Sequence, residues 1–261
     1  MKSQSDYEFS QDFILGIDTK IIGKKIFHLN TIDSTNIYAK KLAEERIEEG
    51  VIILADTQTC GRGRKNRIWS SPKGGLWFSI VLYPNIPPKK AMLLTMASSI
   101  AVFQGIKKIT GITAEIKWPN DLLINKKKVC GILTEIDSEK QKISYCIIGI
   151  GINVNNNLEK ELQINATTLK KELNKELSLH ELLRAIIENF DENYNKLITG
   201  DHDFIRDSWL EYSNIIGRKI QVIDGKNVTT GKVIQVDSDG YIILNTNHGD
   251  IKIINGDIKY L

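Results

Sequence analysis

The chain has 261 residues, of which 41% are hydrophobic, 26% charged and 7% aromatic, with 19 glycines and 5 prolines. This composition is typical of a globular protein and excludes collagen-like, low-complexity and wholly disordered chains. The 35 basic and 32 acidic residues leave a net charge of only +3, which does not favour a nucleic-acid-binding protein.

The cysteines and the N-terminal residues indicate the cellular compartment of the protein. The three cysteines lie far apart and form no C-x-x-C pair, which argues against a disulfide framework or a structural zinc site. A reducing cytoplasm is therefore the predicted location. The first ten residues lack the apolar core of a signal peptide, and no apolar run approaches about 18 residues, so we predict no membrane span.

The N-terminal part predicts strands around two helices. The predicted strands occupy residues 24–29, 51–55 and 76–83. A helix is expected from Ser34 to before Gly50, because capping side chains precede apolar residues at helical spacing. A second helix is expected after Pro88, where apolar residues again repeat with helical period. Between the second and third strands lies a glycine-rich, basic segment, 58–75.

The middle of the chain predicts short strands and then a long amphipathic helix. The expected strands are 113–118, 122–124, 128–137 and 144–150. Ser178 and Glu181 form a capping box, and apolar residues follow it as one stripe up to Gly200. The stripe predicts a helix that packs against a sheet.

The pattern changes after Tyr212, where helical periodicity ends. Turn dipeptides recur at Asp224–Gly225, Asp239–Gly240, His248–Gly249 and Asn255–Gly256. Turns at this spacing predict a small β-barrel or hairpin module. We therefore predict a first domain over residues 1–214 and a second over 215–261.

A glycine- and arginine-rich segment is the first that predicts chemistry. It reads Gly61-Arg62-Gly63-Arg64-Lys65-Asn66-Arg67, and Trp69 follows it. Glycines let backbone amides approach an anion, and arginines supply forked donors for phosphate or carboxylate oxygens. It is not a Walker A loop or a dinucleotide fingerprint, because no G-K-[ST] ends it and Asn66 replaces the third glycine. A solvated basic loop and a nucleic-acid arm are the alternatives.

A turn stiffened by proline carries the second group of polar side chains. It reads Lys117-Trp118-Pro119-Asn120-Asp121, and Lys128 and Gly131 follow. The side chains of Lys117, Asn120 and Asp121 would lie together at the opening of one site. There Asn120 would reach a phosphate oxygen, and Asp121 would hold Mg²⁺ through water. An ordinary Asn–Asp turn above a packed Trp118 explains the same residues.

The third segment, Gly149-Ile-Gly151-Ile-Asn153, predicts a strand whose glycines let a ligand or another backbone come close. No H-E-x-x-H or G-x-S-x-G motif supplies a nucleophile. The pattern therefore fits a reaction between substrates, in which a carboxylic acid attacks the α-phosphate of ATP and an amine attacks the acyl adenylate. The protein would position the reactants and neutralise charge.

The motifs, in this order, resemble those of the biotin protein ligases. The similarity covers about residues 25–155 and is looser through the C-terminal module. The residues that carry it are Asp33 to Asn36, Gln58, Gly61 to Arg64 with Arg67 and Trp69, Lys117 to Asp121, Lys128, Gly131, Gly149, Gly151 and Asn153. The resemblance implies an α+β fold, a mixed β-sheet backed by helices as in class II synthetases, plus a small C-terminal SH3-like β-barrel.

The resemblance also implies a role for each matching residue. The implied biotin contacts are Ser34, Thr35, Asn36, Gln58, Arg62, Gly63, Arg64, Lys128 and Gly131, with Thr35 at the ureido group. The implied nucleotide contacts are Arg64, Arg67, Trp69, Lys117, Asn120, Asp121 and Asn153. The implied catalytic residues are Lys128, Arg64 and Arg62, and Asp121 is the implied Mg²⁺ ligand.

The implied reaction uses biotin, ATP and Mg²⁺. Biotin would be activated to biotinyl-5′-AMP and transferred to one lysine of a biotin carboxyl carrier protein. Only about 25 residues precede the first predicted strand, too few for a winged helix-turn-helix, so we predict a monofunctional ligase without a DNA-binding domain. Homodimers are common in the family, and the sequence leaves this state open.

Two functions other than biotin ligation are alternatives for this sequence. A lipoate ligase or octanoyl transferase is related in fold, but its arginine–serine–glycine motif is absent. An RNA- or DNA-binding module would use the basic loop and predicts strongly salt-dependent affinity.

Asn66 stands where the family often has glycine, and Cys130 where it often has a small residue. Cys130 is predicted to pack, and Cys60 to take no part in the chemistry.

Overall fold

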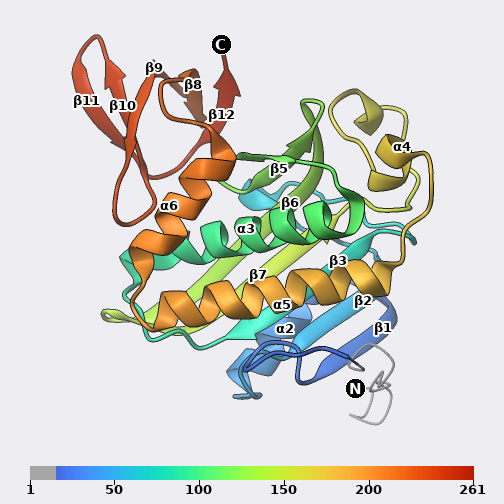
Figure 1. The fold of residues 1–261 in the computed structure, drawn as a ribbon. Coiled ribbons are helices and arrows are strands. Elements are labelled where there is room, and N and C mark those ends of the chain that lie inside the picture. The colour runs from blue at the N-terminus through green and yellow to red at the C-terminus, as the bar shows by residue number, and fades with distance from the viewer. Residues whose placement is uncertain (1–15) are drawn as a thin grey trace.

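The computed structural model describes residues 16–261 and has a seven-stranded sheet at its centre (Figure 1). The strands are β1 Ile26–Ile32, β2 Ile52–Gln58, β3 Leu76–Leu82, β4 Glu115–Lys117, β5 Asp121–Ile124, β6 Lys127–Glu139 and β7 Lys142–Ile152. Their order is β1-β2-β3-β7-β6-β5-β4. β1 pairs parallel with β2, and the other neighbours pair antiparallel, so the predicted mixed sheet is confirmed.

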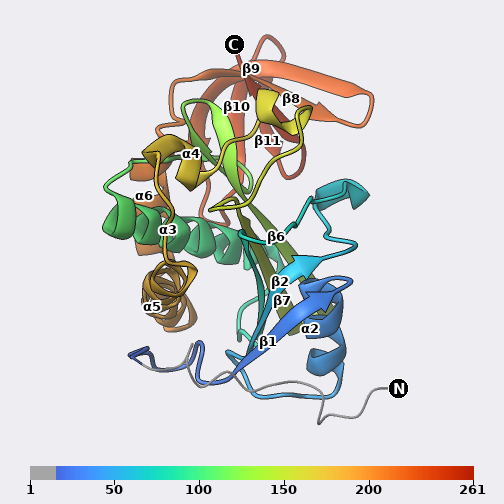
Figure 2. The same cartoon turned by 90° about the vertical axis from the view of Figure 1, so that its right-hand side faces the viewer.

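Helices cover both faces of this sheet (Figure 2). The long helices α3 (Ala91–Thr110) and α5 (Leu179–Ile198) lie on one face, and the shorter α2 (Thr35–Glu44) lies on the other. α3 is buried around most of its circumference, as expected for a helix enclosed between a sheet and other helices. The side chain of Ser178 accepts a hydrogen bond from the Glu181 N–H, so the predicted cap of α5 is confirmed.

The sequence interpretation missed two helices, α4 (Leu169–Leu173) and α6 (His202–Ser213). α4 spans barely more than one turn, too short to show a helical period. α6 buries only two large apolar side chains, Ile205 and Trp209, so its stripe is too sparse to recognise. None of the helices within residues 16–261 combines the length and apolar character needed to cross a membrane.

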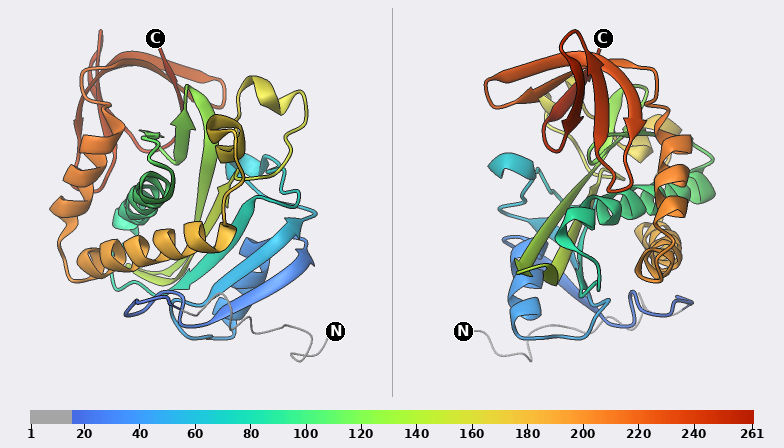
Figure 3. Two further views of the ribbon diagram at one scale, coloured as in Figure 1. Left: turned by 45° about the vertical axis from the view of Figure 1, so that its right-hand side comes forward. Right: turned by 90° about the vertical axis from the view of Figure 1, so that its left-hand side faces the viewer.

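A second, five-stranded sheet follows α6 (Figure 3). It contains β8 Lys219–Asp224, β9 Asn227–Val236, β10 Ile242–Thr246, β11 Gly249–Ile253 and β12 Asp257–Tyr260, in the order β11-β10-β9-β8-β12. All four pairings are antiparallel, and the four turn dipeptides connect successive strands. This small sheet matches the predicted C-terminal module, whereas the boundary between residues 214 and 215 stays a prediction.

The second sheet packs against the first part of the chain. The core is continuous from the main sheet through α3, α5 and α6 into this sheet. Arg218 pairs with Glu115 of β4 at 2.6 Å, and the rings of Phe103 and Tyr212 stack with their centroids 4.3 Å apart. Asp257 of β12 pairs with Arg67 at 2.7 Å, so β12 lies beside the basic segment that follows β2.

Candidate active site

A pocket of about 290 Å³ lies between the main sheet, the basic segment and β12. Fourteen of the fifteen predicted contact residues line it: Ser34, Thr35, Asn36, Gln58, Arg62, Gly63, Arg64, Arg67, Trp69, Asn120, Asp121, Lys128, Gly131 and Asn153. The fold therefore gathers residues from five separate stretches of sequence into one cavity. Their roles in binding and catalysis stay predictions.

Lys117 is the predicted contact that the pocket does not include. Its Nζ lies 5.8 Å from the centroid of the Tyr260 ring, in the contact between β4 and the second sheet. The sequence predicts that Lys117, Asn120 and Asp121 lie together at the opening of one site. In the structure only Asn120 and Asp121 do so. The Tyr260 ring holds the lysine ammonium through a cation–π contact instead.

One end of the pocket presents amide and hydroxyl groups from the first turn of α2. The N–H of Ser34 donates to Asp33 Oδ1 at 2.6 Å, which fixes the chain as the helix begins. Thr35 donates twice to Gln58 Oε1, from its N–H at 2.8 Å and from its hydroxyl at 3.1 Å. Ser34, Thr35 and Asn36 are at most 5% exposed, so these groups suit a neutral polar ligand that replaces their water.

The glycines of β7 make room for side chains. A Cβ on Gly149 would lie 2.0 Å from Asn36 Oδ1, and one on Gly151 would lie 2.4 Å from Trp69 Nε1. The predicted strand is confirmed, but side chains approach it rather than another backbone. Gly149 and Gly151 are about 7 Å apart along a strand, so Asn36 and Trp69 are neighbours on the pocket floor.

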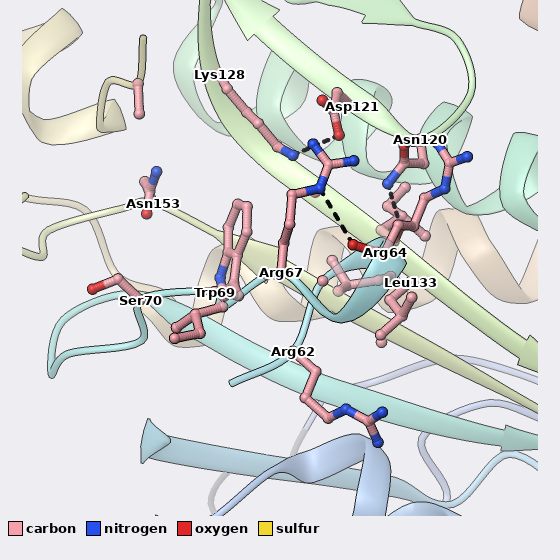
Figure 4. Close-up of a pocket in the computed structure, with 18 of the residues that line it drawn as sticks. Arg62, Arg64, Arg67, Trp69, Ser70, Asn120, Asp121, Lys128, Leu133 and Asn153 are labelled. Atoms are coloured by element: carbon pink, nitrogen blue, oxygen red, sulfur yellow. Dashed lines mark hydrogen bonds and ion pairs between the residues drawn. The ribbon is translucent and has the colours of Figure 1, made fainter. Parts of the chain in front are cut away.

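Lys128 lies beside the floor formed by Trp69. Its Nζ is 2.7 Å from Asp121 Oδ1 and 5.0 Å from the centroid of the Trp69 ring (Figure 4). The carboxylate and the indole face together orient the ammonium group. A Cβ on Gly131 would lie 3.1 Å from Lys128 Nζ, so this glycine also leaves space for the lysine.

The arginines of the basic segment reach the second sheet. Arg64 donates to Asn120 Oδ1 at 3.1 Å and to Asn255 Oδ1 at 2.7 Å, and Arg67 Nη2 lies 2.7 Å and 2.9 Å from the two Asp257 oxygens. Burial lowers the pKa of Arg64, although Asp257 opposes this shift. Arg62 extends in the opposite direction from these two side chains (Figure 4).

Backbone geometry accounts for Asn66, the residue that departs from the family pattern. Its φ is 58°, in the left-handed region that favours glycine. Asparagine adopts this region more readily than most side chains do. The turn that brings Arg64 and Arg67 together is therefore retained without the glycine.

The ion pairs between the basic segment and the second sheet should restrict the motion of that segment. Asp257→Asn removes the charge that holds Arg67, and Arg67 and Asp257 are partly exposed, so the pair contributes about 0.4–1 kcal/mol. We expect trypsin to cleave the segment about two- to fivefold faster in this variant. The matched control is Asp250→Asn, which alters a carboxylate on β11, at the opposite edge of the same sheet. Equal cleavage of D257N and wild-type protein would contradict the prediction.

The same pair has a defined pH dependence. Burial alone would raise the pKa of Asp257, but the hydrogen bond and charge of Arg67 outweigh it and hold that pKa below its ordinary value. Such a carboxylate contributes stability above its unfolded-state pKa, about 3.9, and loses it as the pH falls through the lower folded-state pKa. The difference in thermal midpoint between wild type and D257N should therefore persist from pH 8 to 5, begin to shrink near pH 4 and vanish only once the pH falls below the lowered folded-state pKa.

The sequence interpretation missed one wall of the pocket. Leu158, Glu161, Leu162, Asn165 and Ala166, between β7 and α4, form this wall. The available signal was a pair of leucines in a stretch that is otherwise polar. Ile68, Ser70 and Leu133 also line the cavity.

The groups near Asp121 bear on Mg²⁺. Its carboxylate pairs with Lys128, and within residues 16–261 no three histidine, cysteine, aspartate or glutamate side chains gather in a way that would hold a metal ion. Mg²⁺ commonly uses one or two carboxylates together with substrate phosphates. The donors present therefore fit an ion that arrives with a nucleotide and touches Asp121.

The cysteines take no part in this arrangement. Cys130 is fully buried beneath the pocket, and burial raises the pKa of its thiol far above neutrality, so it does not form a thiolate. Cys60 is exposed next to the basic segment. Neither of them, and no histidine, is among the described residues that line the cavity.

These features define a class of protein. A mixed sheet carries a cavity with neutral hydrogen-bonding groups at one end and cations at the other, and this is the arrangement of an enzyme that binds and activates a small anionic substrate. Lys65 and Arg67 of the basic segment are paired with Asp224 and Asp257, which reduces the positive surface that the segment offers to a nucleic acid.

Comparison with known proteins identifies the family. Residues 29–153 match the profile described as the Biotin/lipoate A/B protein ligase family. The bifunctional ligase/repressor BirA of Bacillus subtilis is 37% identical over 94% of this chain and 76% of its own. The biotin--[acetyl-CoA-carboxylase] ligase of Paracoccus denitrificans is 30% identical over 81% of this chain and 90% of its own. The chain belongs to the biotin protein ligase family, and it is an enzyme of the ligase class.

A solved structure agrees with this assignment. The biotin protein ligase from Aquifex aeolicus, in complex with biotin and ATP, superposes with a TM-score of 0.78 at 30% identity. The match covers 91% of this chain and 99% of that one. The predicted family and the α+β fold are therefore confirmed. The absence of an N-terminal DNA-binding domain stays a prediction.

Proposed function

We propose that this protein activates biotin with ATP to form biotinyl-5′-AMP and then transfers the biotinyl group to a lysine of a biotin carboxyl carrier protein. The observation that carries the proposal is the position of Lys128. Its side chain lines the same pocket as Thr35, Asn36 and the arginines, and its ammonium group lies 2.7 Å from Asp121 Oδ1 and 5.0 Å from the centroid of the Trp69 ring. A cation there is suited to an anion that forms between two bound substrates.

In the first step, a carboxylate oxygen of biotin bonds to the α-phosphorus of ATP while the bond to the leaving pyrophosphate breaks. The Lys128 ammonium would approach both the carboxylate and the α-phosphate, so the two anions meet with their repulsion reduced. Arg64 and Arg67 would bind the phosphates, and Asp121 would hold Lys128 in place. Mg²⁺, carried in with ATP, would supply further neutralisation of the phosphates.

In the second step, the amine of the carrier lysine bonds to the acyl carbon of the adenylate, and AMP leaves with the bonding electron pair. The amine loses a proton to become the amide. Lys128 and Arg64 would stabilise the departing phosphate. The cytoplasmic location stays a prediction, and whether the chain forms a homodimer stays open.

The test is biotin-dependent ATP–pyrophosphate exchange by the purified protein, followed by labelling of a carrier domain. We expect exchange to require biotin, and lipoate and octanoate to fail as substitutes. Labelling should disappear when the target lysine of the carrier is replaced by arginine. Exchange supported by lipoate or octanoate alone would overturn the proposal in favour of a lipoate-type enzyme, and exchange without labelling would overturn the transfer step.

A further inference from the structure

A buried serine lies directly behind the polar end of the pocket. Ser79, in the middle of β3, is fully buried and does not line the cavity. Its hydroxyl oxygen lies 2.6 Å from Asn36 Oδ1 and 2.7 Å from Thr35 Oγ1, and its single hydrogen can bond only one of them. It therefore contacts two pocket residues from behind, where no ligand reaches it.

A carboxylate fixes the amide of Asn36. Asn36 Nδ2 donates to Glu135 Oε2 at 2.7 Å. Because a carboxylate only accepts hydrogen bonds, the NH₂ group of Asn36 has to point to Glu135, and its oxygen has to point to Ser79. Glu135 thus decides that the single Ser79 hydrogen goes to Asn36, so Ser79 can only accept from Thr35.

The other end of the chain of hydrogen bonds is fixed by the backbone. The Thr35 N–H donates to Gln58 Oε1 at 2.8 Å, so Gln58 presents its oxygen to Thr35, and its NH₂ group donates to Ser71 Oγ at 2.8 Å. The Thr35 hydroxyl donates to the same Gln58 oxygen at 3.1 Å. A backbone N–H cannot accept, so this orientation of Gln58 is not interchangeable.

These orientations determine how the hydroxyl of Thr35 can form hydrogen bonds. A hydroxyl has one hydrogen and two lone pairs. The Ser79 hydrogen is already used by Asn36, so the Thr35 hydrogen points to the back of the pocket, shared between Ser79 Oγ at 2.7 Å and Gln58 Oε1 at 3.1 Å. The lone pairs are what Thr35 offers to the pocket, so it acts toward a ligand as an acceptor.

We propose that Ser79 and Glu135 are positioning residues that make Thr35 a hydrogen-bond acceptor for an N–H group of the ligand. The inference rests on the proposed function, in which the ligand is biotin, whose cyclic urea carries two N–H groups. A site built to pair with an N–H binds its ligand well only while the acceptor is correctly oriented. Neither residue touches the reacting carboxylate, so they act on binding and not on the chemical step.

The decisive experiment is a double-mutant cycle on the dissociation constant of biotin, measured by calorimetry. Ser79→Ala removes the nearer acceptor of the Thr35 hydrogen, which can then turn toward the pocket, and should weaken binding roughly tenfold. In a Thr35→Val background the oriented hydroxyl is gone, so Ser79→Ala should have almost no further effect. In exchange assays S79A should raise the KM for biotin by a similar factor and leave kcat within about twofold of wild type. Independent, additive effects of the two substitutions would overturn the proposal.

Substitutions of Glu135 give a second test. Glu135 is half-buried, so replacing it disturbs the packing of the core less than replacing the fully buried Ser79. Glu135→Gln keeps an acceptor oxygen and should bind biotin within about twofold of wild type. Glu135→Met, similar in length, removes the acceptor and should bind several-fold more weakly. Asp137→Asn, an exposed change on the same strand, is the matched control and should bind normally.

The outcomes separate the two proposals. If wild-type protein binds biotin but E135M binds as tightly as E135Q, Glu135 does not position Asn36 and the inference is wrong. If wild-type protein binds no biotin, the proposed function is wrong, and the inference falls with it. Thermal midpoints of every variant identify loss of binding that comes from unfolding, and the E135M arm remains decisive if S79A does not fold.

Discussion

Replacement of Lys128 with alanine is expected to slow biotin-dependent ATP–pyrophosphate exchange by about 100- to 1,000-fold. The ammonium group belongs to a residue that lines the pocket and lies 2.7 Å from Asp121 Oδ1. Its removal leaves the Asp121 carboxylate unpaired beside the two anionic substrates, so repulsion replaces attraction where they have to meet. The measurement is the initial exchange rate at saturating biotin and ATP.

Lys127→Ala is the matched control for this prediction. Lys127 is the preceding residue of β6, and its Nζ donates to the carbonyl oxygen of Gln163 rather than lining the pocket. The control should exchange within about twofold of wild type, and both variants should keep the wild-type thermal midpoint within a few degrees. Near-normal exchange by K128A would remove Lys128 from the mechanism.

The second large effect is expected at Gly149, where alanine should lower the free energy of unfolding by about 2–3 kcal/mol and abolish tight biotin binding. The added Cβ would lie 2.0 Å from Asn36 Oδ1. Asn36 cannot yield without losing its hydrogen bonds to Ser79 and Glu135, since all of its polar atoms are engaged in a buried site. Urea denaturation gives the stability, and calorimetry gives the affinity.

A compensating substitution distinguishes this clash from a general effect of alanine in β7. Asn36→Ala removes the atoms that the new Cβ meets, so Gly149→Ala should cost less than about 1 kcal/mol in that background. Biotin binding should stay weak in the double variant, because Asn36 is itself absent. An equal cost of Gly149→Ala in both backgrounds would show that the close approach to Asn36 is not its cause.

The sequence by itself determined most of the secondary structure and most of the residues that line the pocket. Apolar periodicity located α3 and α5, the Ser178 cap located the start of α5, and turn dipeptides located the strands after residue 216. These features are local, because a period, a cap or a left-handed turn depends on residues within a few positions of one another. Motif order then identified the family, and all but one of the predicted contact residues line one cavity.

Only the tertiary structure decided which partners these residues meet. Arg67 and Asp257 are 190 positions apart, and Lys117 faces Tyr260 of the second sheet instead of the pocket. In the sequence, Ser79 is one residue of an apolar strand and gives no sign that it donates to Asn36. The direction of a hydrogen bond depends on which donors and acceptors become neighbours, and the folded chain alone brings those neighbours together.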